Sequence, residues 1–273
     1  MKKLNFKMAF MMAAVVIGSP VFTSCSNDDD NDSAGGGMTS KHISKMTWSD
    51  GDELEVTTYE YDSQGRVVKK TETVIEGRSE YSTTTTYTYG GNTIISKTQG
   101  DSNDGETHTY TLSNGRITKD VEKNNGRNSY TSNYTYDSNG YLILQAFGDD
   151  SDDSYSGKME FTWTDGNLTK SSKVVDDIYS PYSYTYTVSY SNILWPQNLI
   201  AYWDGTNMDE VLEPLGAWGK MPKNLPTKFV EVNDNGETNG WTIDYTIENG
   251  EIVKMIVKDL DGSNTQIYTI EWK

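Results

Sequence analysis

The sequence predicts an all-β protein: a large, water-soluble, antiparallel up-and-down β-barrel of about 14–16 strands, with one short helical insert plugging one mouth. Three observations lead to this fold class. Tight-turn sequences recur at a nearly constant spacing. Apolar and polar residues alternate on both sides of these turns. One stretch, residues 191–227, departs from the alternation and carries a helical pattern instead.

The chain begins with a predicted signal peptide, residues 1–24, which takes no part in the fold. Three lysines precede an apolar core, Met8 to Ile17, that is too short to span a bilayer. The segment runs into Phe22-Thr-Ser-Cys25, which resembles a bacterial lipobox. Cys25 is the single cysteine of the sequence, so we predict that it carries a lipid anchor. The alternative is ordinary signal cleavage that leaves the thiol unused.

Residues 25–37 are predicted to be a lipidated tether. The run from Ser26 to Gly37 is acidic and then glycine-rich, with little apolar surface to bury. An acidic run directly after the modified cysteine resembles the surface-export signal of Bacteroides-type lipoproteins, although a plain solvated linker is an alternative. We therefore expect an outer-membrane lipoprotein exposed at the cell surface, with a periplasm-facing orientation as the alternative.

The charge of the chain limits its partners. Loss of the three signal-peptide lysines moves the formal net charge from −17 to −20. Such a surface repels phosphate backbones and anionic headgroups, so we expect no nucleic-acid binding and no membrane contact through a basic patch.

Residues 38–273 are expected to form a single barrel domain. Tight turns lie at 62–65, 90–92, 113–115, 137–140, 165–166 and 248–250, and the turn glycines from Gly65 to Gly166 are 26, 24, 25 and 26 residues apart. A period of about 25 residues corresponds to two strands and their connections. The predicted strands are 41–48, 53–61, 66–75, 80–89, 93–98, 106–112, 116–122, 129–136, 141–147, 156–163, 167–174, 183–190, 228–233, 240–247, 251–258 and 265–272.

Closure of these strands into a barrel would remove both exposed sheet edges. A long two-layer sandwich and an open curved shell are the alternatives. The glycine-marked turns should share one rim, which we call the tight-turn rim, and longer links such as 100–105 and 148–157 should form the opposite, long-link rim. With an even strand count, both termini lie at the tight-turn rim.

The aromatic residues are predicted to face the interior. In the strand at 183–190, Tyr184, Tyr186 and Tyr190 share one face, and serine and threonine occupy the other. A lipid-facing surface should instead be rich in leucine, valine and phenylalanine at mid-depth. The inverse arrangement, with tyrosines outward around a threonine-lined lumen, is the alternative.

Two resemblances accompany this pattern. The run Tyr59-Glu-Tyr-Asp-Ser-Gln-Gly-Arg66 is similar to the YD repeats of Rhs-type shell proteins. The mature chain, including Gly219-Lys-Met-Pro-Lys-Asn-Leu-Pro226, resembles a family of Bacteroides-type outer-membrane lipoproteins of unknown function that is described as porin-like in fold. The resemblance implies a large antiparallel porin-like barrel and carries no assigned activity.

Residues 191–227 form the predicted insert. Thr206 or Asn207 could cap a short helix, with Asp209 in its first turn and Pro214 ending it. Because a barrel of this size is too wide for its own side chains to fill, the insert is expected to plug one mouth. The functional alternative is a ligand pocket, possible because aromatic platforms bind sugars and other flat apolar faces. Its candidate lining residues are Trp195, Tyr202, Trp203 and Trp218.

The sequence carries no recognisable catalytic or metal-binding constellation. His108 alternates with Tyr110 and is expected to be an inward, hydrogen-bonded residue. No nucleophile elbow, zinc ligand set or phosphate loop is present, and no cofactor is expected. The Asn233-Asp-Asn-Gly236 run superficially suggests calcium but is better explained as a hairpin turn. The acidic run at 149–153 is expected to be a solvated loop, with weak divalent-cation binding as an alternative.

These inferences favour a monomeric, non-enzymatic binding or structural lipoprotein, held in the outer membrane by its lipid. A glycan or another cell-surface ligand is the candidate partner. An outer-membrane pore or pore accessory is the first alternative, and a hydrolase with an unrecognised carboxylate pair is the second.

Overall fold

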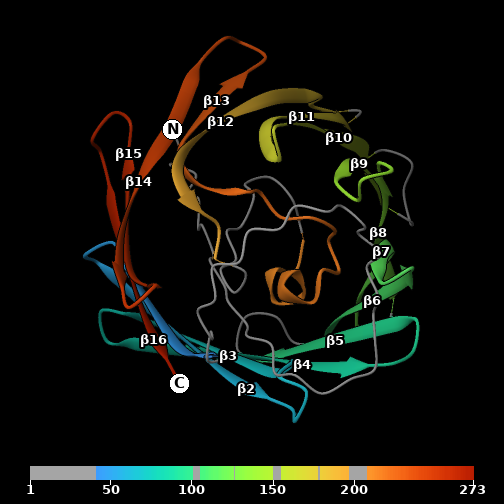
Figure 1. Cartoon of the computed structure of the whole chain (residues 1–273). Coiled ribbons are helices and arrows are strands. Elements are labelled where there is room, and N and C mark those ends of the chain that lie inside the picture. The colour runs from blue at the N-terminus through green and yellow to red at the C-terminus, as the bar shows by residue number, and fades with distance from the viewer. Residues whose placement is uncertain (1–40, 101–104, 126, 150–154, 178, 197–207) are drawn as a thin grey trace, which may run out of the picture.

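The computed structural model describes residues 41–100, 105–125, 127–149, 155–177, 179–196 and 208–273. Its strands form a closed ring in which each strand pairs antiparallel with its neighbours in sequence, and the first strand closes on the last (Figure 1). The predicted up-and-down barrel is therefore confirmed, and the sandwich and open-shell alternatives are wrong.

The ring contains strands from every hairpin that the turn pattern predicted. They are β1 (Ile43–Ser49), β2 (Glu53–Tyr61), β3 (Val67–Glu76), β4 (Ser79–Tyr89), β5 (Thr93–Gly100), β6 (Glu106–Ser113), β7 (Arg116–Asn124), β8 (Arg127–Tyr136), β9 (Leu142–Gly148), β10 (Tyr155–Thr164), β11 (Asn167–Asp177), β12 (Tyr182–Leu194), β13 (Asn224–Asn233), β14 (Thr238–Glu248), β15 (Glu251–Asp259) and β16 (Thr265–Trp272).

The clearest difference from the predicted boundaries lies at the insert. Strands β12 and β13 extend to Leu194 and from Asn224, so they take residues from both ends of the predicted 191–227 segment. Their pairing continues through register shifts, with Tyr190 opposite Pro226. A proline has no amide to donate to the ladder and is tolerated in a strand at such an irregularity.

Turn chemistry fixes the tight-turn rim. The carboxylate of Asp62 accepts hydrogen bonds from the amides of Gln64 and Arg66, and Gly65 takes the positive φ of 74° that closes the turn. Asn114 and Gly115 both have positive φ, as a two-residue type I′ hairpin requires. Both ends of the barrel chain meet at this rim, because His42 and Lys273 exchange backbone hydrogen bonds.

Tyrosines face the interior, as predicted. Tyr59, Tyr110 and Tyr186 are at most 3% exposed, whereas the alternate positions of the same strands are polar and open to solvent. The inverse arrangement, with tyrosines outward, is therefore wrong. These large rings form one apolar core with the inward aliphatic residues, and the insert packs against it.

A second aromatic residue, near the tight-turn end of every even-numbered strand except β6, ties that strand to the one before it. Its hydroxyl or indole N–H donates to the backbone carbonyl at the start of the preceding odd-numbered strand, over 2.7–3.0 Å. A register shift beside many of the turns leaves that carbonyl free to accept. The pairs are Tyr61–Ile43, Tyr89–Val67, Tyr136–Ile117, Trp163–Leu142, Tyr190–Leu168, Tyr245–Pro226 and Trp272–Ile252.

Candidate functional site

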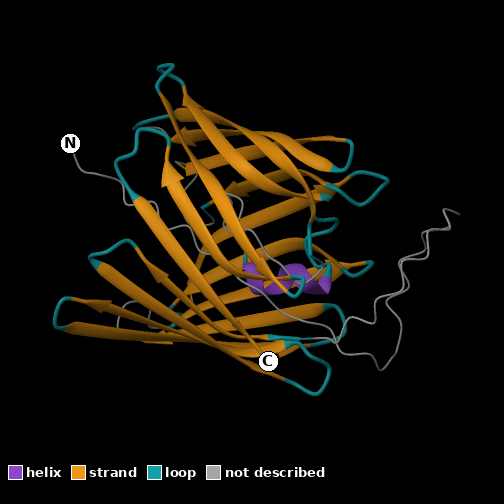
Figure 2. Cartoon of the chain, turned by 60° about the vertical axis from the view of Figure 1, so that its left-hand side comes forward, coloured by secondary structure: helices purple, strands orange, loops and turns teal. Residues whose placement is uncertain are grey.

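The described part of the insert between β12 and β13, residues 208–223, lies inside the ring on the side of the tight-turn rim. Its helix η1 (Glu210–Leu215) is a short 3-10 helix, purple in Figure 2. Val211 and Leu212 on this helix are 1% and 0% exposed and belong to the same core as the inward tyrosines. The predicted helical stripe therefore packs against the barrel wall.

Backbone hydrogen bonds hold the insert to the wall at several points along its length. The Ile117 amide donates to the carbonyl of Ala217 over 2.8 Å. The amides of Lys220 and Lys223 donate over 2.9 Å each to the carbonyls of Gly140 and Gly166, which lie in two tight turns. Because these bonds use main-chain groups of adjacent hairpins, they fix the insert as a built-in part of the barrel.

The insert lies so close to the barrel at position 219 that this residue must be glycine. Gly219 has a φ of 85°, and a β-carbon there would lie 2.5 Å from the carbonyl oxygen of Gly140 and 2.9 Å from the ring of Tyr136. No side chain fits between these groups. This glycine opens the Gly219–Pro226 run that carried the family resemblance.

The helix cap differs from the prediction. The side chain of Asp209 accepts a hydrogen bond from the amide of Val211 over 3.1 Å, so Asp209 caps the helix from outside instead of lying in its first turn. Thr206 and Asn207, the predicted caps, lie outside the described residues. Pro214 lies within the helix, where its ring suits the tight 3-10 geometry but not a longer α-helix.

The four predicted pocket aromatics fall into two groups. Trp195 and Trp218 are 8% and 3% exposed and belong to the core, and Tyr202 and Trp203 lie outside the described residues. Trp218 packs against Tyr134 with ring centroids 4.9 Å apart, and its indole N–H donates to the carbonyl of Asp209 over 2.7 Å. The cavity that Trp218 lines is about 20 Å³, room for about one water molecule and too small for a sugar ring.

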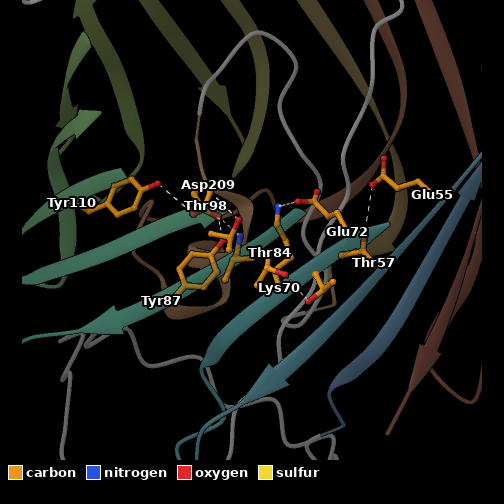
Figure 3. A network of polar contacts seen from close by, with 12 residues as sticks. Glu55, Thr57, Lys70, Glu72, Thr84, Tyr87, Thr98, Tyr110 and Asp209 are labelled. Atoms are coloured by element: carbon orange, nitrogen blue, oxygen red, sulfur yellow. Dashed lines mark hydrogen bonds and ion pairs between the residues drawn. The ribbon is translucent and has the colours of Figure 1, made fainter. Parts of the chain in front are cut away.

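Asp209 also joins the insert to a polar network on the wall. The hydroxyls of Tyr87 and Tyr110 donate to its two carboxylate oxygens over 3.2 and 3.3 Å, and Lys70 reaches Glu72 over 3.0 Å (Figure 3). Burial raises the pKa of Asp209 above its ordinary value, against the charges of Lys70 and His108 and its own hydrogen bonds.

His108 lies between two carboxylates on this wall. Its Nδ1 is 2.9 Å from Asp120 and its Nε2 is 3.0 Å from Glu106, which confirms the predicted inward, hydrogen-bonded histidine. Burial lowers the pKa of His108, but the hydrogen bonds and charges of both acids outweigh it and raise the pKa to about 10. The hydrogen bond from His108 in turn lowers the pKa of Glu106. The ring is therefore an imidazolium at neutral pH.

Above the insert, toward the long-link rim, one side of the lumen is aromatic. We call Tyr130, Phe147, Tyr155, Tyr182 and Tyr184 the aromatic wall. They lie near the long-link ends of β8, β9, β10 and β12, and their neighbouring ring centroids are 5.8–6.3 Å apart. The Lys173 ammonium joins the two halves of this wall, 5.3 Å from the Phe147 centroid and 5.6 Å from that of Tyr184.

Gly157 makes room for the aromatic wall. A β-carbon at this position would lie 2.7 Å from the ring of Phe147 and 2.4 Å from the carbonyl oxygen of Val174. Gly157 is paired with Phe147 across β9 and β10, so the ring lies directly over the glycine backbone.

Another part of the lumen lining is acidic. We call Glu55, Glu72, Glu106 and Glu122 the acidic wall; they point inward from β2, β3, β6 and β7, as their pairing with inward residues requires. In the ring order, β2 lies opposite β10 and β3 opposite β11, whereas β7 is next to β8 and pairs Glu122 directly with Tyr130. All four glutamates, and Tyr130, Tyr155 and Tyr184 of the aromatic wall, are half-buried rather than buried. Water therefore reaches both walls inside the barrel.

The calcium-like run is a turn. The Asn233 side chain accepts hydrogen bonds from the amides of Asn235 and Glu237, and Gly236 closes the turn with a φ of 78°. In the described ranges, no group of three or more His, Cys, Asp or Glu side chains is placed to hold a metal ion. Residues 150–153 of the other acidic run, and the predicted lipid-bearing Cys25, lie outside the described residues.

The family model of a domain of unknown function (DUF4595) with a porin-like fold matches residues 59–254. The chain belongs to this family. A search of curated proteins gave no match. Two solved structures are similar to this chain, and because both are under 25% identical to it they show the fold alone.

The first is a porin-like protein from Bacteroides uniformis ATCC 8492, with a TM-score of 0.63 and 18% identity, matched over 85% of this chain and 96% of that one. The second is a porin-like protein from Bacteroides vulgatus ATCC 8482, with a TM-score of 0.60 and 15% identity, matched over 85% and 98%. The resemblance to a porin-like family is thus confirmed at the level of fold.

Proposed function

We propose that this DUF4595 protein is an exported, lipid-anchored outer-membrane protein that binds a ligand in the long-link half of its lumen, without conducting solutes and without catalysis. One observation carries the proposal. The insert is hydrogen-bonded into the tight-turn half of the lumen, while half-buried side chains line the other half. A barrel closed at one end is a cup that can hold a ligand.

The outer surface also favours a barrel that is anchored beside the membrane over one that spans it. Lys158 and Glu160 form an exposed ion pair in the middle of β10, and Lys258 pairs with Asp244 on β15 and β14. A lysine facing lipid at the bilayer midplane costs about 2–4 kcal/mol. Separately, and with no bearing on how the strands lie, none of the helices within the described residues is long and apolar enough to cross a membrane.

Binding is favoured over catalysis by how the inward acids are engaged. Asp209 accepts hydrogen bonds from two tyrosines and a backbone amide, and Asp120 and Glu106 both hold His108. Acids and a histidine locked together in this way stabilise the wall. A general acid or base needs its proton within reach of a substrate.

A detergent phase-separation assay tests the anchor and the outer surface together. We expect the mature lipidated protein to enter the detergent-rich phase and the Cys25→Ser variant to stay in the aqueous phase, because the acyl chains alone hold the protein in lipid. Partition of Cys25→Ser into detergent would show that the barrel wall itself faces lipid and would contradict the proposal. Recovery of both forms in water would contradict the lipid anchor.

A further inference from the structure

The long-link half of the lumen combines two surfaces that suit different parts of one ligand. The aromatic wall offers ring faces, and the acidic wall offers hydrogen-bond acceptors beside it, at Glu122, and across from it, on β2 and β3. Resting on the proposed binding function, we propose that this space takes an uncharged saccharide, with its C–H faces against the tyrosines and its hydroxyls on the glutamates.

The tyrosines of the aromatic wall have the exposure, ring stacking and neutral hydroxyls that suit such a ligand. Tyr182 is 37% exposed at the mouth, and its ring stacks on that of Tyr184 with centroids 5.9 Å apart. Burial, followed by a hydrogen bond with Tyr155, raises the pKa of Tyr182 to about 12, so its hydroxyl is neutral at physiological pH. Rigid tyrosines provide large contact areas at low entropic cost, with a hydroxyl at the edge for hydrogen bonding.

Charge argues against an anionic ligand. The acidic wall contributes four glutamates, and the basic groups described near them, Lys70 and His108, are already joined to Glu72 and Glu106. Since the formal charge of the whole chain is −17, a phosphate or carboxylate would enter against a negative potential.

Charge also argues against an organic cation at the aromatic wall. A cation would bind over the ring faces, but the Lys173 ammonium already lies over Phe147 and Tyr184. A second positive charge there would be repelled. An uncharged, hydroxyl-rich ligand avoids repulsion by the glutamates and by Lys173. Its hydroxyls can both donate and accept hydrogen bonds.

The test is a glycan array read with the full mature protein, carrying uncharged oligosaccharides such as maltohexaose and cellohexaose beside acidic and amino oligosaccharides of equal length. We expect binding to uncharged members. The double variant Tyr155→Ala, Tyr182→Ala should weaken it by about tenfold or more, since two stacking contacts are lost. Thr187→Ala, on the outer face of the same strand β12, is the matched control and should bind as the wild type does.

Absence of binding to any uncharged oligosaccharide by the folded protein would overturn the saccharide assignment, as would binding that the double variant leaves intact. Binding restricted to amino or acidic oligosaccharides would also overturn it. Binding to acidic or amino members alone would leave the proposed binding function standing, and the partition of Cys25→Ser tests the anchor and the outer surface independently of any ligand. Thermal unfolding of both variants confirms that loss of binding is not loss of fold.

Discussion

Replacing Trp218 with alanine is expected to lower the free energy of unfolding by about 3–5 kcal/mol, the largest effect of any single side chain in the insert. Trp218 is 3% exposed, packs edge-on against Tyr110 and Tyr134, and donates its indole N–H to the carbonyl of Asp209. Its loss leaves a cavity between insert and wall and frees one buried acceptor. Chemical denaturation of the mature protein measures the change.

The matched control is Tyr179→Ala, because Tyr179 is an aromatic residue that is 87% exposed. Its loss should change the unfolding free energy by less than about 0.5 kcal/mol. If Trp218→Ala were as mild as this control, the insert would not be part of the cooperative core.

Removing Asp120 is the second large effect expected. Asp120→Ala should cost about 3 kcal/mol at neutral pH, because it takes one partner from a half-buried, charged histidine. Asp120 is 5% exposed and lies 2.9 Å from His108. Asp120→Asn keeps an acceptor but not the charge, so it should fall between wild type and alanine. Asp244→Asn, in an exposed pair with Lys258, is the control and should cost less than about 1 kcal/mol.

The ion pair of His108 with Asp120 also predicts how the free energy of unfolding depends on pH. The pKa of His108 rises from an ordinary 6.5 to about 10 in the folded protein, so folded His108 holds a proton that the unfolded chain has released. Its contribution is complete below pH 6.5 and is lost as the pH rises toward 10. Wild-type stability should therefore fall across this window, by at most about 1.4 kcal/mol per pH unit.

In Asp120→Ala the free energy of unfolding should fall less steeply as the pH rises, because the histidine loses its strongest stabilising partner. Measurements of unfolding free energy from about pH 6.5 to 8.5 stay more than one unit below the pKa of tyrosine in the unfolded chain, near 10. An equal slope in wild type and variant would show that His108 is not held as an imidazolium.

The barrel could be predicted from the sequence because its determinants are local. Each Asp-x-x-Gly or Asn-Gly turn fixes its own hairpin, and two-residue alternation assigns each face, so Tyr186 was placed inward correctly. Repetition then gave the strand count. The second tyrosine of the Tyr-x-Tyr-Asp motif had a role that the pattern did not reveal, since its carbonyl partner lies on the preceding strand.

The polar network could not be predicted because it joins distant parts of the chain. Asp209 meets Tyr87 and Tyr110 across 122 and 99 residues, and only the closed ring brings them together. A usable signal was present: Lys70 and Asp120 occupy inward positions of their strands, and a charge in such a place needs a partner. The aromatic wall likewise depends on strand register, which places Phe147 over Gly157.

Hydrogen–deuterium exchange tests most directly whether the insert is a fixed plug. We expect the amides of Lys220 and Lys223 to exchange as slowly as those of the flanking strands, because each is bonded to a turn carbonyl of the barrel. Peptides covering 208–223 should therefore stay protected until the barrel itself unfolds. Complete exchange of these peptides within seconds, while the strands remain protected, would contradict an insert that closes the tight-turn end of the barrel. It would favour the alternative of an open pore.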